Sequence, residues 1–166
     1  MREEGRDMKL KSVYQEHPTT PARIQEAERI IGVALPREYT EYLLSHRGGH
    51  PDPDVFRVHW SGQDWAEGND INSVAWMLAI HNGKDENFLD YYKTHKGRIP
   101  DDTVPIARDP GGNLILLGTL GPNKGKVFFW QRDYEIDPGS GQPADYSNVG
   151  FVANSFDEFA KSLFAL

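Results

Sequence analysis

The chain has 166 residues and is 38% hydrophobic and 11% aromatic, a composition typical of a single folded domain with one core. It has no cysteine, which excludes disulfides, thiolate metal sites and a cysteine nucleophile. The sequence contains no run of eighteen apolar residues that would indicate a membrane span, and the charged first eleven residues predict no secretory signal. We therefore expect a cytoplasmic protein. The formal net charge of −7 argues against nucleic acid and membrane lipid as partners.

A helix is predicted directly after residues 1–18, which we interpret as an N-terminal extension. Thr20 is a suitable N-cap, Pro21 suits the first helical position, and Gly32 suits the end of the helix. One face of this helix is formed by Ile24, Ala27, Glu28 and Ile31. Because an unpaired carboxylate on an apolar face is costly, we expect Glu28 to accept hydrogen bonds from backbone N–H groups at the start of the next helix or from a tyrosine hydroxyl.

A second helix is expected to start at Pro36 and to end at Gly48 and Gly49. Its buried stripe is formed by Tyr39, Tyr42, Leu43 and His46.

The next segment combines predicted strands with a third helix. Residues 55–60 alternate in the manner of a half-buried strand, and a loop is expected over residues 61–72. Residues 73–80 fit either a helix or a strand, and we favour a strand because Gly83 follows so closely. From a capping Asp85, an amphipathic helix is expected to continue to Gly97.

Three strands separated by glycine-rich turns predict an antiparallel meander, at residues 104–108, 113–119 and 126–131. Residues 114–117 are apolar without alternation, as in a central strand covered on both faces. A mobile loop is expected at 137–143 and a short edge strand at 151–152. Ser155 and Glu158 form a capping box for a closing helix.

These elements predict an α+β fold in one domain at residues 19–166. It would consist of an antiparallel meander sheet of about five to six strands, with about four helices packed mainly on one face.

Three blocks of the sequence carry a recognisable pattern. They are Glu-x-x-Ile-Gly-x-x-Leu-Pro-x-x-Tyr from Glu28 to Tyr39, the segments 98–100, 104–107 and 109–114, and Gly-Lys-Val-Phe-Phe-Trp at 125–130. In this order and spacing they resemble the SUKH superfamily, which is named partly for yeast cell-wall assembly regulators and includes immunity proteins of bacterial polymorphic toxin systems. The resemblance covers most of residues 22–164. Arg47 departs from it, because the family usually has Asn before the Gly-Gly pair.

The resemblance implies a cytoplasmic immunity protein, without enzymatic activity, that binds and neutralises a toxin domain, most simply a nuclease with a basic cleft. A second reading is a regulatory scaffold similar to the yeast relatives. A third, a small-ligand or enzymatic role in a cleft between sheet and helices, has the least support. We expect no cofactor and a monomer or weak dimer.

Acidic side chains are concentrated in the middle of the chain. Residues 1–51 sum to zero charge, whereas residues 52–145 carry fifteen acidic and nine basic side chains. The candidate partner-binding residues are Asp52, Asp54, Asp64, Trp65, Glu67, Asp70, Asp133, Glu135 and Asp137. The acidic loops would steer a basic protein partner, although such charge also serves solubility alone.

Four tryptophans differ in their expected roles. Trp60, Trp76 and Trp130 fall within predicted strands, and we expect them in the core. Trp65 lies in a loop between acidic residues, where it would be either an interface anchor or a lid folded onto the sheet.

No catalytic constellation is recognisable in the sequence. There is no Gly-x-Ser-x-Gly elbow, and Ser140, although between glycines, lies in a proline-rich loop. His46 and His50 have a metal-ligand spacing but straddle a glycine break, and residues 50–54 suit a cation site less well than a proline-stiffened acidic loop. We therefore expect no catalytic residue and no metal.

Overall fold

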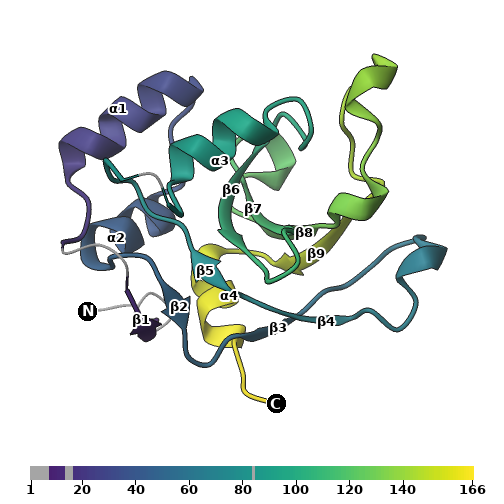
Figure 1. Ribbon diagram of the computed structural model, residues 1–166, viewed down its shortest axis with the longest axis horizontal. Helices are drawn as coiled ribbons and strands as arrows, with labels where there is room; N and C mark the ends of the chain where they lie inside the picture. The colour runs from purple at the N-terminus through teal and green to yellow at the C-terminus, as the bar shows by residue number, and fades with distance from the viewer. Residues whose placement is uncertain (1–7, 14–16, 84) are drawn as a thin grey trace.

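Figure 1 shows the protein as a computed structural model, which describes residues 8–13, 17–83 and 85–166. The helices of this part of the chain are α1 (Pro21–Ile31), α2 (Arg37–Ser45), α3 (Phe88–His95) and α4 (Phe156–Ser162). Its strands are β1 (Leu10–Ser12), β2 (His50–Pro51), β3 (Val55–Arg57), β4 (Ile71–Ser73), β5 (Trp76–Met77), β6 (Thr103–Arg108), β7 (Leu114–Gly118), β8 (Val127–Trp130) and β9 (Val149–Ala153). No helix in these described ranges has the length and apolarity needed to cross a bilayer.

The main sheet has five strands in the order β5-β6-β7-β8-β9, and each neighbouring pair is antiparallel. Strand order therefore follows chain order, which confirms the predicted meander. The apolar run 114–117 forms β7 at the centre of the sheet and is fully buried. The predicted edge strand at 151–152 is β9, which pairs with β8 over five residues of its own length.

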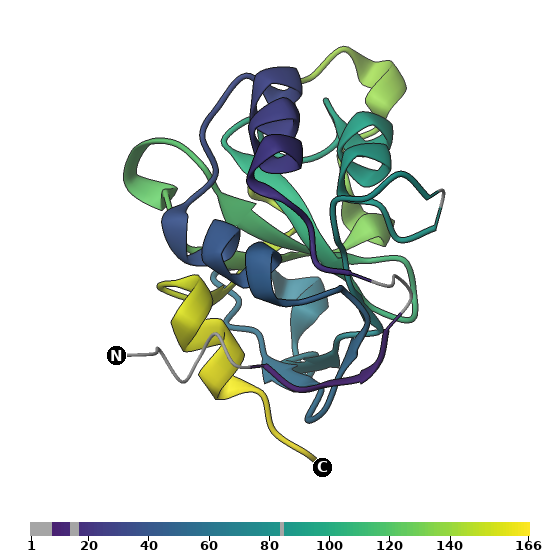
Figure 2. The same ribbon diagram turned by 90° about the vertical axis from the view of Figure 1, so that its left-hand side faces the viewer.

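The two faces of the sheet are covered differently. Alternate residues of β7 point to opposite sides, so that Ile115 joins the larger core cluster and Leu116 the smaller one. The larger cluster contains the buried faces of all four helices, and Figure 2 shows α1, α2 and α4 along one side of the sheet. The opposite face is covered mainly by loops, through Ile99 and Tyr146. The predicted α+β class, with helices mainly on one face, is confirmed.

Glu28 connects the first two helices. Its carboxylate accepts a hydrogen bond from the backbone N–H of Leu35 at 2.7 Å, one residue before the cap of α2. The expectation that Glu28 binds a backbone N–H group at the start of the second helix is therefore confirmed. Thr20 caps α1 by accepting from the N–H of Arg23, as the sequence predicts.

The end of α2 was placed too late by the sequence pattern. The helix ends at Ser45, because His46 is extended at φ −128° and ψ 148°. Gly49 instead pairs with Met77, and its φ of +133° and the backbone oxygen of Ser12 leave no room for a Cβ atom. The glycine pair thus serves a close approach of two chain segments and does not cap the helix.

Three further local predictions differ from the structure. The N-cap of α3 is Asn87, whose side chain accepts from the N–H of Leu89, and Asp85 lies outside the helix. Part of the expected loop 61–72 is strand β4, which pairs with β3 in a hairpin that projects to the right in Figure 1. The expected strand 73–80 is reduced to the two residues of β5.

A part of the predicted N-terminal extension packs onto the domain. β1 pairs with β2 in an antiparallel bridge, and Met8 is buried in the larger core cluster. Residues 1–7 and 14–16 lie outside the described residues, and the boundary between residues 18 and 19 stays a prediction.

At the C-terminal end, Ser155 accepts a hydrogen bond from the N–H of Glu158, and the Glu158 carboxylate accepts one from the N–H of Asn154, which confirms a reciprocal cap on α4.

Candidate partner-binding surface

Seven of the nine candidate partner-binding residues lie on two long loops. The hairpin loop, residues 58–70, joins β3 to β4, and the sheet loop, residues 131–148, joins β8 to β9. Both project from the same side of the molecule, the right-hand side in Figure 1. The hairpin loop carries Asp64, Trp65, Glu67 and Asp70, and the sheet loop carries Asp133, Glu135 and Asp137.

Aromatic side chains join the two loops. The rings of Trp65 and Tyr134 are stacked, with centroids 4.0 Å apart and an angle of 9° between their planes. Trp60 meets Trp65 edge to face at a centroid distance of 5.0 Å, and it meets Phe129 of β8 in the same way at 6.2 Å. The loops are therefore in direct contact over a chain of rings that ends in the core.

Trp65 is half-buried in this contact, folded against Trp60 and Tyr134. Tyr134, whose ring is 49% exposed, was not singled out by the sequence analysis. The sequence did contain one signal for Tyr134, because an aspartate precedes it just as Asp64 precedes Trp65. In the structure, each of these two pairs lies within a one-turn 3₁₀ helix. The expectation that Trp60 and Trp76 lie in the core was wrong, since both are only half-buried, whereas Trp130 is fully buried.

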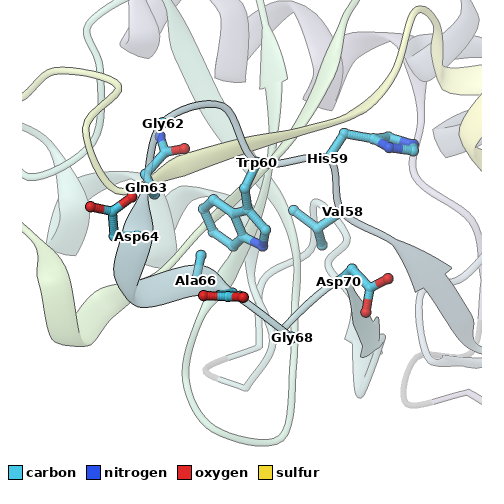
Figure 3. A pocket seen from close by; sticks show the side chains of 10 residues that line it. Val58, His59, Trp60, Gly62, Gln63, Asp64, Ala66, Gly68 and Asp70 are labelled. Atoms are coloured by element: carbon cyan, nitrogen blue, oxygen red, sulfur yellow. The ribbon is translucent and has the colours of Figure 1, made fainter.

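A hollow of about 520 Å³ opens beside Trp60, on the concave side of the hairpin loop (Figure 3). The side chains of Asp64, Glu67 and Asp70 line it, together with Val58 and Ala66 among others. In Figure 3 the indole of Trp60 lies between Asp64 and Asp70. These three acidic residues are exposed, and none of them forms an ion pair within the described part of the chain.

The hairpin loop is held against the edge of the main sheet. His59 and Phe151 of β9 exchange backbone hydrogen bonds of 2.7 and 2.9 Å. The side-chain amide of Gln63 donates to the backbone oxygens of Tyr146 and Val149 at 3.5 and 3.4 Å. The acidic residues of this loop are therefore presented on a fixed backbone.

The acidic residues of the sheet loop have local partners. Glu135 accepts two hydrogen bonds from the guanidinium of Arg98, at 3.1 and 2.9 Å, and these bonds raise the pKa of Arg98. Asp137 accepts from the N–H of Gly139, and Asp133 lies 3.8 Å from the guanidinium of Arg132. The carboxylates of Asp133 and Glu135 thus lie beside arginine side chains, and the carboxylate of Asp137 accepts a hydrogen bond within a turn.

The far end of the sheet loop is fixed by a hydrogen-bond cluster. The hydroxyl of Tyr146 donates to Asp102 at 2.6 Å and accepts from the side-chain amide of Asn123 at 3.0 Å. Burial, followed by the adjacent Asp102 carboxylate, raises the pKa of the Tyr146 hydroxyl. This loop is therefore anchored at both of its ends.

Asp52 and Asp54 lie apart from the two loops, in the turn between β2 and β3. The carboxylate of Asp54 lies 3.1 Å from Nε2 of His50. In the described residues no group of three or more His, Asp or Glu side chains is arranged to hold a metal ion. Ser140 donates its hydroxyl hydrogen to the backbone oxygen of Asp137, within the turn that follows Asp137.

We use the name acidic aromatic surface for a set of six residues from the two loops. They are Trp60, Asp64, Trp65, Glu67, Asp70 and Tyr134. The surface combines two half-buried tryptophan rings and the exposed Tyr134 with carboxylates that form no ion pair with another described residue, and this combination suits the binding of a basic protein.

Comparisons with known proteins agree with the resemblance seen in the sequence. The sequence model of the SMI1/KNR4 family (SUKH-1) matches residues 18–162. The chain is similar to the SPbeta prophage-derived uncharacterized protein YokK of Bacillus subtilis (strain 168), with 29% identity over 155 aligned residues that cover 87% of this chain and 74% of that protein. With a family match over most of its length, the chain belongs to the SMI1/KNR4 family (SUKH-1).

Proposed function

We propose that this protein is an immunity protein that binds a basic toxin domain, in particular a nuclease, and covers its active cleft with the acidic aromatic surface. The observation that carries the proposal is the set of three exposed carboxylates, Asp64, Glu67 and Asp70, that have no ion-pair partner among the described residues and surround Trp60. Membership in the SMI1/KNR4 family supports binding to a protein.

Inhibition would follow from occlusion and needs no catalytic step. The three carboxylates would face the Lys and Arg side chains with which a nuclease holds the phosphates of its substrate. Trp65 and Tyr134 would exclude water at the centre of the contact, as aromatic anchors do in tight interfaces. The protein would act in the cytoplasm as a monomer or weak dimer and without a cofactor.

The rigidity of the surface supports rapid and tight binding. The contacts of His59 and Gln63 with β9 already order the hairpin loop in the free protein. Little conformational entropy is then lost when the partner binds. The negative field of the loop would also accelerate association with a basic partner, and this effect weakens as salt is added.

The test is growth rescue of cells that express the toxin-like domain encoded beside the gene of this protein. Wild-type protein should restore growth, and the triple reversal Asp64→Lys, Glu67→Lys, Asp70→Lys should abolish rescue. A matched control reverses three exposed acidic residues elsewhere, Asp85→Lys, Asp90→Lys and Asp101→Lys, and should still rescue. Circular dichroism establishes that each variant is folded.

Two results would contradict the proposal. Equal rescue by both triple variants would remove the hairpin loop from the interface. Absence of rescue by the wild type, together with capture of endogenous proteins from the cell, would favour a regulatory scaffold.

A further inference from the structure

We infer that the hollow beside Trp60 is a receptor for an arginine side chain of the protein partner. The inference rests on the proposed function and specifies which side chain the surface recognises. It is carried by three features of the hollow: a fixed aromatic ring in its lining, three carboxylates that form no ion pair with another described residue, and the absence of lysine and arginine from its lining.

The ring of Trp60 is held from several directions. Its indole N–H donates to the backbone oxygen of Asn69 at 2.7 Å, and the ring makes edge-to-face contacts with Trp65 and Phe129. Gly150 of β9 lies directly behind the ring, since a Cβ atom at this position would come within 3.0 Å of the indole carbon Cε3. Figure 3 shows the ring at the centre of the hollow. The ring is therefore a fixed platform with a face available to a ligand.

The charge of the lining selects a cationic ligand. Asp64, Glu67 and Asp70 contribute three carboxylates, and His59 is the one side chain of the lining that can become positive. A phosphate or a carboxylate would be repelled from such a site. A cation would gain both the ion-pair contacts and the attraction of the indole face.

The shape of the site favours arginine over lysine. A guanidinium group is planar, so it can stack on an indole and at the same time direct N–H donors sideways toward carboxylates. In Figure 3 Asp64 and Asp70 lie on opposite sides of the ring, so a guanidinium stacked on the indole has an acidic residue on each side of it. A lysine ammonium is a compact and strongly hydrated charge that gains less from the ring. Two ligands of equal charge should therefore bind differently.

The experiment compares tetra-arginine and tetra-lysine peptide amides, which carry the same number of side-chain charges. Each is titrated into the full-length protein by calorimetry at low and at physiological ionic strength. Tetra-arginine should bind about 3–10-fold more tightly, the factor that corresponds to a cation–π contact at a partly exposed site. Trp60→Leu should abolish this preference, whereas Asp90→Asn, a control on α3, should preserve it.

A second measurement uses the wild-type protein alone, so that it does not depend on the folding of a variant. In nitrogen–proton correlation spectra, the indole N–H signal of Trp60 should shift strongly with tetra-arginine and weakly with tetra-lysine. The signal of Trp76, in β5 at the other edge of the main sheet, is the internal control. Equal affinities for the two peptides, or equal shifts of the Trp60 and Trp76 signals, would overturn the inference.

The inference and the proposed function fail in different ways. Growth rescue without a preference for tetra-arginine would overturn the arginine receptor and leave the immunity role in place. A preference for tetra-arginine without growth rescue would support the receptor and remove the immunity role.

Discussion

The hairpin loop and the sheet loop are similar in composition and different in structure. Each contains glycine and asparagine, an aromatic residue preceded by an aspartate, and several carboxylates. In the hairpin loop, Asp64, Glu67 and Asp70 face solvent around Trp60. In the sheet loop, Glu135 and Asp137 are bound to groups of the protein itself. A charge count treats these residues alike, whereas the geometry separates carboxylates that are available to a partner from carboxylates that stabilise the fold.

The difference has a physical reason. The sheet loop spans eighteen residues without strand pairing of its own, so its polar groups must find partners locally. The loop starts beside Trp130, which is buried beneath the guanidinium of Arg98. Glu135 of the loop forms an ion pair with this guanidinium. The hairpin loop is held by backbone pairing and by ring contacts. Its carboxylates form no ion pair with another described residue.

The largest effect on stability is expected for Glu135→Ala. The side chains of Arg98 and Glu135 are 27% and 16% exposed, so the change leaves a partly buried guanidinium without its partner. The free energy of unfolding should fall by about 2 kcal/mol, as measured by urea denaturation. Asp133→Ala is the control within the same loop, because the Asp133 side chain is 70% exposed, and it should cost less than about 0.5 kcal/mol. Equal losses in the two variants would erase the distinction between the loops.

A smaller loss is expected for Glu28→Leu, which extends the comparison to a carboxylate outside both loops. The variant leaves the N–H of Leu35 without its acceptor, and the free energy of unfolding should fall by about 1 kcal/mol. Thermal unfolding followed by circular dichroism measures this change, with Asp101→Asn at an exposed position as the control. Undiminished thermal stability would show that the hydrogen bond of Glu28 is dispensable.

A pH-dependent effect is expected near the anchor of the sheet loop. Burial lowers the pKa of His95, which packs edge to face on Trp130 and lies close to Arg98 and Glu135. Below pH 6.5 the unfolded chain then binds more protons at this position than the folded chain, so stability should decrease as the pH falls from about 7 toward 5. Denaturation midpoints across this range should vary less in His95→Gln than in the wild type. An unchanged slope in the variant would exclude His95 as the source.

The smallest effect on stability is expected for neutralisation of the hairpin loop. Asp64→Asn, Glu67→Gln and Asp70→Asn together should change the free energy of unfolding by less than about 0.5 kcal/mol, because their charges make no ion pair with described residues. Urea denaturation of this triple variant beside Glu135→Ala gives the comparison directly. A large loss in the triple variant would assign these carboxylates a structural role.

The main sheet was predictable because its signals are local. The apolar strands 104–108, 113–119 and 126–131 alternate with glycine-rich turns, and each pairs with its neighbour in the chain. The N-cap at Thr20 and the reciprocal cap of Ser155 and Glu158 depend only on nearby residues as well.

The features that escaped prediction depend on distant residues. Gly49 is fixed by contact with Ser12 and Met77, and β4 is a strand because it pairs with β3. The composition of the sheet loop does not reveal that Glu135 binds Arg98, since 37 residues separate the two in sequence. Tyr134 follows an aspartate as Trp65 does, and its stacking on Trp65 is the contact that assigns it to the acidic aromatic surface.

The most direct test compares the two loops in one binding experiment with the proposed partner, the toxin-like domain encoded beside the gene of this protein. Its affinity is measured by calorimetry for the hairpin-loop variant Asp64→Asn, Glu67→Gln, Asp70→Asn and for the sheet-loop variant Asp133→Asn, Asp137→Asn, Asp145→Asn. The account predicts that the first variant binds about 100-fold more weakly than the wild type and that the second changes by less than about threefold. Equal losses of affinity, or a larger loss in the sheet-loop variant, would contradict the assignment of partner binding to the hairpin loop.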